Sequence, residues 1–284
     1  MKQFFSAFLM MFCLQCFAQI KVPADFTFTT PFYEAENKYI VFSPKPNDKD
    51  FSLGVPYFDP SAGYTYKYLG NLKDDNGNLN FVPTENGIIY RWENMDMKVA
   101  VLSDQRIKEF KLENPPEFLK FYKSGKPEKD LLVDKLSFLN GAGFSNLALL
   151  QLEQLRKENY KSGKFYFELA FAYNALDQSS KAEEVVNEAE KNGFRNELLI
   201  KEMHYALLHQ NKLIPAADYL ENNFKNFKSK FYKSEGIVNQ ISNFSKSKDV
   251  KNAQKWIGLY KKEIGEDQYK PRVDDVEKRL KDIK

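Results

Sequence analysis

Histidine is the residue type best suited to proton transfer or metal binding at neutral pH, and this chain has only two, His204 and His209. They lie five residues apart, which on a helix turns them about 140° away from each other. One metal ion is therefore not easily held by both, and no Ser or Asp pattern beside them indicates nucleophilic catalysis. We expect His204 in a packed interior and His209 exposed near a helix end. The sequence predicts no catalytic residue, no metal site, no cofactor and no enzyme activity.

A second candidate for metal chemistry is the alternation of Asp74, Asn76 and Asn78, which is typical of a calcium loop. The glycine, however, is Gly77 rather than the residue after Asn78, and a strand-like run follows. We therefore interpret this segment as a hairpin turn.

Both cysteines, Cys13 and Cys16, lie in residues 1–18, which have the pattern of a signal peptide. Lys2 precedes an apolar run that is too short to cross a bilayer comfortably. Cleavage after Ala18 would leave a mature chain without thiols, which excludes disulfides, cysteine nucleophiles and thiolate metal sites. We expect export to the periplasm, with secretion or an outer-membrane lipoprotein as alternatives.

The composition excludes a strongly charged surface. Lys and Arg number 42 and Asp and Glu number 39, so the chain has no strong field for nucleic acid, and we predict no nucleic-acid partner. Nothing after residue 18 resembles a membrane span, so we predict no transmembrane segment in the mature chain. The mature chain is long enough for two modest cores.

Residues 19–123 have the alternating pattern of strands, separated by turn residues. Asn76-Gly77 and Asn86-Gly87 are expected to be hairpin turns because both residue types favour positive φ. We predict an antiparallel β-rich domain of about five strands with two short helices at its end. The expected strands are residues 25–30, 38–43, 63–70, 79–83, 87–92 and 97–102, and the expected helices are residues 103–112 and 115–123.

One strand of this domain has a row of aromatic side chains. Tyr64, Tyr66 and Tyr68 alternate with other residues, so they stand on one face of the strand. If exposed, they could stack on a sugar, which gives a glycan-binding accessory protein as the alternative function. A cross-strand aromatic ladder within the core of the sheet is the more usual role of such a row.

A polar stretch, residues 123–130, separates this domain from a helical half with a period of 34 residues. Ala148, Ala182 and Ala216 are 34 residues apart, since 182 − 148 = 34 and 216 − 182 = 34. Each is followed four residues later by Leu or Val on the same helix face. A fourth copy has Ala253, which is 37 residues after Ala216, and we expect three extra residues in the turn before it.

This period and the order of residue types resemble the tetratricopeptide repeat. Ser180 and Glu183 have capping-box spacing, which predicts a helix that starts near Lys181. The resemblance implies an all-α solenoid of about four hairpins over residues 130–268 and a capping helix over residues 269–284, so the whole chain is expected to be α+β. The residues that should pack the repeats are Tyr166, Leu169, Ala170, Tyr173, Ala182, Val186, Ala148 and Ala216.

The resemblance also implies a function, because proteins of this family bind extended peptides or helices on the face of their first helices. The carboxylate-clamp type needs Lys, Asn and Arg at places where this chain has residues such as Glu168 and Glu202, so a chaperone-tail receptor is not expected. The sequence predicts an exported, non-enzymatic adaptor for a protein or peptide partner. Its aromatic groove residues could instead pack against adjacent repeats. The predicted groove consists of Phe167, Phe171, Asn174, Asn140, Lys201 and Tyr205.

Overall fold

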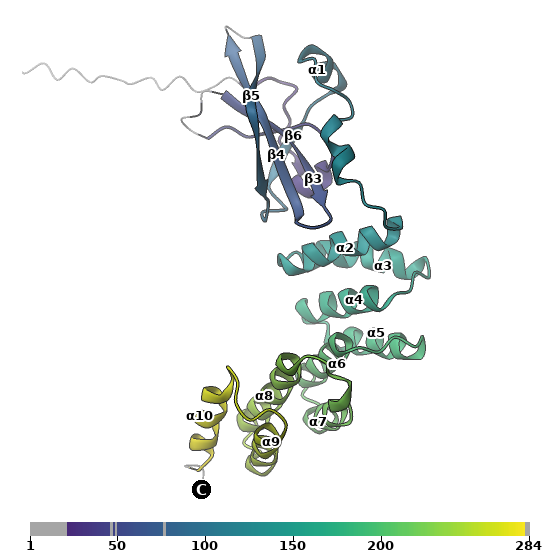
Figure 1. Cartoon of the computed structure of the whole chain (residues 1–284), viewed down its shortest axis with the longest axis vertical. Coiled ribbons are helices and arrows are strands. Elements are labelled where there is room, and N and C mark those ends of the chain that lie inside the picture. The colour runs from purple at the N-terminus through teal and green to yellow at the C-terminus, as the bar shows by residue number, and fades with distance from the viewer. Residues whose placement is uncertain (1–21, 46–47, 49, 76–77, 282–284) are drawn as a thin grey trace, which may run out of the picture. The chain divides into compact units, whose positions relative to one another are not determined.

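The computed structural model describes residues 22–45, 48, 50–75 and 78–281 (Figure 1). The chain divides between Lys123 and Ser124 into two compact units, each treated by itself below. The expected signal peptide and the expected turn at Asn76-Gly77 lie outside the described residues.

The first unit is an antiparallel sheet of six strands in its described residues, in the order β1-β6-β2-β3-β4-β5. Its core is built from apolar side chains such as Phe51, Leu53 and Val55 of β3, against which Ile107 of α1 packs. The helix α1 (Asp104–Glu109) and the 3-10 helix η2 (Glu117–Tyr122) end the unit, as expected. The strands are β1 (Thr30–Pro31), β2 (Ile40–Phe42), β3 (Asp50–Asp59), β4 (Gly63–Asp75), β5 (Asn78–Arg91) and β6 (Lys98–Val101).

Three of the strand predictions were wrong. The segment expected as a strand over residues 25–30 pairs only at β1, and β3 was not predicted at all. The two strands expected over residues 79–83 and 87–92 form the single strand β5, so Asn86-Gly87 is not a hairpin turn. In β5, Pro83 pairs with Gly70 and Ile88 with Tyr68, so four residues of β5 bulge opposite one residue of β4.

The second unit is a series of helical hairpins, α2/α3, α4/α5, α6/α7 and α8/α9, each packed on the next, followed by α10 (Figure 1). The first helices of successive hairpins, α2, α4, α6 and α8, also contact one another. The chain is therefore α+β, with a helical solenoid after the sheet, as the sequence predicted. The helices are α2 (Glu128–Gly141), α3 (Ser145–Lys157), α4 (Gly163–Ala175), α5 (Ser179–Lys191), α6 (Glu197–His209), α7 (Leu213–Asn222), α8 (Lys230–Lys246), α9 (Val250–Glu263) and α10 (Lys270–Lys281).

The 34-residue period corresponds to equivalent places in consecutive hairpins. Ala148, Ala182 and Ala216 are each the fourth residue of their helix, in α3, α5 and α7, and each is fully buried. A small residue there lets the second helix of a hairpin approach its neighbours closely. The other residues expected to pack the repeats, Tyr166, Leu169, Ala170, Tyr173 and Val186, are buried as well.

The turn inside each hairpin contains one residue with positive φ, at Gly143, Asp177, Asn211 and Lys248. These residues are 34, 34 and then 37 positions apart (177 − 143, 211 − 177 and 248 − 211). The three extra residues of the fourth copy do not lengthen the turn, as we expected. They extend α8, which runs to Lys246 and has 17 residues where α4 and α6 have 13.

The first helices begin at side-chain caps that satisfy free backbone N–H groups. Ser162 caps α4, Asn196 caps α6 and Ser229 caps α8, each by accepting a hydrogen bond from a backbone nitrogen two or three residues ahead. The capping box expected at the start of α5 was wrong, because the helix begins before Ser180 and its N-cap residue, Gln178, makes no such bond.

Candidate functional site

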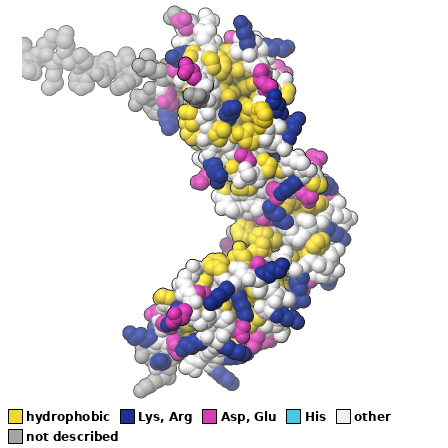
Figure 2. All heavy atoms as spheres, in the orientation of Figure 1, with side chains coloured by type: hydrophobic (Ala, Val, Ile, Leu, Met, Phe, Trp, Pro, Cys, Tyr) yellow, Lys and Arg dark blue, Asp and Glu magenta, His cyan; other side chains and the backbone are white. Residues whose placement is uncertain are grey.

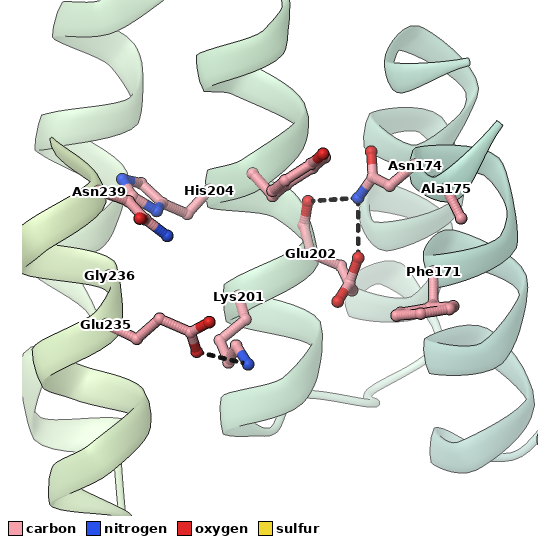
Figure 3. Close-up of a pocket in the computed structure, with 10 residues that line it drawn as sticks. Phe171, Asn174, Ala175, Lys201, Glu202, His204, Glu235, Gly236 and Asn239 are labelled. Atoms are coloured by element: carbon pink, nitrogen blue, oxygen red, sulfur yellow. Dashed lines mark hydrogen bonds and ion pairs between the residues drawn. The ribbon is translucent and has the colours of Figure 1, made fainter. Parts of the chain in front are cut away.

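A pocket of about 350 Å³ lies between the first helices α4, α6 and α8 (Figure 3). Hydrophobic side chains also gather on the surface of the helical unit beside α4 (Figure 2). Apolar, amide and charged side chains line the pocket together, which is the usual composition of a ligand site. The lining residues are Phe171, Asn174, Ala175, Lys201, Glu202, His204, Tyr205, Glu235, Gly236 and Asn239.

One wall of the pocket is a hydrogen-bonded pair between α4 and α6. The Nδ2 atom of Asn174 donates to the carbonyl oxygen of Glu202 at 3.0 Å and to its carboxylate Oε2 at 2.8 Å. Both partners are acceptors, which fixes the orientation of the amide. The Oδ1 atom of Asn174 is buried and has no hydrogen-bond partner among the described residues.

The same pair occurs one repeat earlier, where Asn140 Nδ2 donates to the carbonyl and carboxylate oxygens of Glu168 at 3.0 and 2.8 Å. We call these two pairs the Asn–Glu ladder. At the next 34-residue step the ladder ends, because Leu208 and Gly236 occupy the equivalent positions. A Cβ atom on Gly236 would lie 3.1 Å from the side chain of Leu220, so close packing of α7 and α8 favours glycine here. No side chain therefore enters from α8 at this position, which leaves space beside Glu202.

Glu202 is the most perturbed acid of the pocket. Its side chain is largely buried, with 8% of the residue exposed. Burial raises the pKa of its carboxyl to about 7, while the Asn174 hydrogen bond and the nearby Lys201 lower it less. Its second oxygen, Oε1, has no hydrogen-bond partner among the described residues and points away from Asn174 into the pocket (Figure 3).

The cation of the pocket is already paired. Lys201 Nζ lies 2.8 Å from Glu235 Oε2, across the space between α6 and α8 (Figure 3). The same ammonium lies 4.2 Å from the centre of the Tyr232 ring, a cation–π contact. Lys201 is therefore neutralised within the protein and is not a free anion-binding group.

His204 has a structural role, as its position in the repeat predicted. Its Nε2 lies 2.9 Å from Gln240 Oε1, and Gln240 Nε2 donates to the carbonyl of Leu213. Gln240 thus presents its oxygen to the ring, so His204 Nε2 carries the proton. Burial lowers the pKa of His204 to about 4, which keeps the ring neutral at pH 7. His209 is exposed at the end of α6, where its ring stacks on that of Tyr205 at 4.0 Å.

The structure brings most of the predicted groove residues together. Asn140 lies apart from the pocket, in the first rung of the ladder. Phe167 is half-buried beside Phe171 on α4, with the ring centres 6.1 Å apart. The predicted groove residues that line the pocket are Phe171, Asn174, Lys201 and Tyr205.

The sequence prediction missed the two acids of the pocket, Glu202 and Glu235. A signal for Glu202 was present, because Asn140 and Asn174, like Glu168 and Glu202, are separated by the repeat period of 34 residues. Polar residues that recur with the packing residues indicate a buried polar pair between repeats. No such signal marked Glu235.

The tyrosine row of the first unit is mostly unavailable to a sugar. Tyr64 and Tyr66 are buried, and only Tyr68 is partly exposed, with its hydroxyl donating to Asn71 Oδ1 at 2.8 Å. Tyr66 lies in an aromatic cluster on the sheet, which supports the interpretation as a cross-strand ladder. The cluster contains Phe32, Phe42, Tyr66, Tyr90 and Trp92.

Within the described part of the chain, no group of three or more His, Cys, Asp or Glu side chains is placed to hold a metal ion. No helix in that part is both long and apolar enough to span a membrane. In comparisons with known proteins, the chain matches no protein-family model and has no significant similarity to a curated protein.

Proposed function

We propose that the protein is an exported, non-enzymatic adaptor of the tetratricopeptide type, whose helical unit binds a protein or peptide partner on the surface formed by α4, α6 and α8. The observation that carries this proposal is the pocket between these helices. It is lined by side chains that the repeat does not need for its own packing. Tyr205 is 38% exposed and Phe171 is half-buried, whereas the packing residues of the same helices are buried.

The charges of the pocket support a partner other than a free C-terminal carboxylate. A carboxylate clamp requires unpaired cations, but Lys201 is paired with Glu235. Glu202 adds a second acidic group to the same surface. Binding of an internal segment of a partner, in an extended or helical form, fits this arrangement better.

The proposed location rests on the sequence of residues 1–18, with the periplasm preferred and secretion or an outer-membrane lipoprotein as alternatives. The first unit receives no separate function. A glycan-binding role for it has less support, because Tyr64 and Tyr66 are buried.

The proposal can be tested by selecting peptides from a random-peptide display library on the immobilised mature chain. Phe171→Ala and Tyr205→Ala remove the aromatic walls of the pocket and should abolish binding of the selected peptides. Leu150→Ala is the matched control, because Leu150 is 73% exposed on α3 and does not line the pocket. A selection without enriched peptides, or enriched peptides that bind all variants equally, would refute the proposal.

A further inference from the structure

We propose that the pocket between α4, α6 and α8 binds a basic side chain, Lys or Arg, of the partner segment, with the Glu202 carboxylate as its counter-ion. This inference rests on the proposed function, since it names the group that the partner inserts. It goes further by assigning one residue of the partner a chemical class.

The first support is an acceptor without a donor. Glu202 Oε2 is held by Asn174, but Oε1 points into the pocket without a partner among the described residues, although more than nine-tenths of the residue is buried (Figure 3). A buried carboxylate that lacks hydrogen bonds is costly unless a ligand supplies them. The missing partner must therefore be a hydrogen-bond donor, and a cationic donor compensates the charge as well.

The second support is charge complementarity. The helix α4 contributes no titratable side chain to the lining, and α8 contributes only Glu235, whose charge is balanced by Lys201. On α6, His204 is neutral, and Tyr205 is neutral because burial raises its pKa. Ionised Glu202 is thus the one unbalanced charge of the lining, and Glu168 and Glu235 add repulsion to it. A ligand with one positive charge neutralises the pocket.

The third support is the shape and chemistry of the walls. Phe171 and Tyr205 line the pocket on two sides of Glu202, from α4 and α6. Lys and Arg have apolar stems that pack on such rings while the charged head reaches a deeper anion. Aromatic faces also attract the cation itself. The empty position at Gly236 leaves room for this stem beside α8.

The position of the acid gives the binding a characteristic pH dependence. Because burial raises the pKa of Glu202 to about 7, part of the free protein holds a proton on this carboxyl at neutral pH. A bound cation favours the ionised form, so the affinity for a basic ligand rises with pH as the carboxyl ionises. Between about pH 6 and about pH 8 the increase should be about tenfold.

The test uses the peptides selected on the wild-type chain. Each Lys or Arg of a selected peptide is replaced in turn by norleucine, which keeps an apolar stem and removes the charge. At one position the replacement should weaken binding to the wild type at least about tenfold at pH 8. Glu202→Gln should bind both forms of that peptide equally and should lose the pH dependence.

Glu168→Gln is the matched control, because Glu168 makes the same ladder contact one repeat away and does not line the pocket. This variant should keep the preference for the basic peptide. Selected peptides without a basic residue, or a preference that persists in Glu202→Gln, would overturn the inference and leave the proposed function intact. A selection that yields no binding peptide at all would overturn both.

Discussion

The side-chain amide of Asn174 on α4 donates to both the carbonyl oxygen and the carboxylate of Glu202 on α6, at 3.0 and 2.8 Å. Asn140 and Glu168 make the same contact one repeat earlier with the same two distances. The repeat period is therefore present in buried polar pairs as well as in apolar packing. Each pair joins the first helices of two consecutive hairpins, and the second pair also forms a wall of the pocket.

The first rung of the ladder should stabilise the helical unit. Asn140→Ala leaves the carbonyl and carboxylate of Glu168 without their donor, which should lower the free energy of unfolding by about 1 to 3 kcal/mol. Asn146→Ala is the matched control, because Asn146 is exposed on α3, and it should change little. Urea unfolding followed by helical circular dichroism measures both. Equal stability of the two variants would show that the ladder contributes nothing.

Glu202→Gln should stabilise the protein at alkaline pH. The folded-state pKa of Glu202 is raised to about 7, so its contribution is complete below the unfolded-state value near 4.5 and is lost as pH rises through 7. The wild type should lose up to about 3 kcal/mol over this window, and the glutamine variant should not. At pH 8 the variant should therefore unfold at higher urea. Parallel pH profiles for the two proteins would contradict the burial of an unpaired acid.

His204 should have the opposite effect on acid stability. Its folded-state pKa is lowered to about 4 from 6.5, so its contribution is complete above 6.5 and is lost as pH falls towards 4. His204→Gln can still donate to Gln240 but does not titrate, so it should remove this loss. Comparing urea midpoints of the variant and the wild type at about pH 7 and about pH 4.5 gives the difference, which should amount to about 3 kcal/mol at most. A variant with the wild-type acid profile would show that the ring is accessible to protons.

The alanines at the repeat positions should not tolerate larger residues. Ala182 is fully buried where α5 packs, and Ala182→Leu should cost about 1 to 3 kcal/mol or more through overpacking. Asn187→Leu introduces the same side chain at an exposed place on the same helix and should be nearly neutral. Trp256 lies in α9 and Trp92 in the sheet unit. A Trp92→Phe background therefore lets fluorescence report the helical unit alone, and equal unfolding midpoints would argue against close packing at Ala182.

The helical half was predictable because its information is periodic. Ala148, Ala182 and Ala216 identified matching helix positions, since a repeated hairpin imposes the same steric demand at each copy. The fourth copy was placed correctly only in part. Its three additional residues extend α8 rather than the turn, because a helix can absorb an insertion at its end while the residue with positive φ, Lys248, still closes the hairpin.

The sheet was harder to predict because its exceptions are tertiary. Gly54 and Pro56 made β3 resemble a loop, but a Cβ atom on Gly54 would lie 2.3 Å from the carbonyl oxygen of Lys67. Glycine is required there by close approach of β4 at a bulge, not by a turn. Asn86-Gly87 likewise belongs to a bulge inside β5. Nothing in the local sequence distinguishes these uses of glycine.

The pocket could be anticipated only in its aromatic part. Phe171 and Tyr205 follow from the helix face beside the packing residues. The space next to Glu202 depends on the absence of a side chain at Gly236, and the pairing of Lys201 depends on Glu235 from another repeat. Such features require the packed structure, because they combine residues from three helices.

The most direct test of the adaptor function is site-specific photo-crosslinking in cells that produce the chain with its own N-terminus. A benzoylphenylalanine residue in place of Tyr205 should yield a crosslinked protein in the envelope fraction that is absent when the same residue replaces Leu150 on α3. The same crosslinking pattern at both positions, or no crosslinked protein at position 205, would contradict the account.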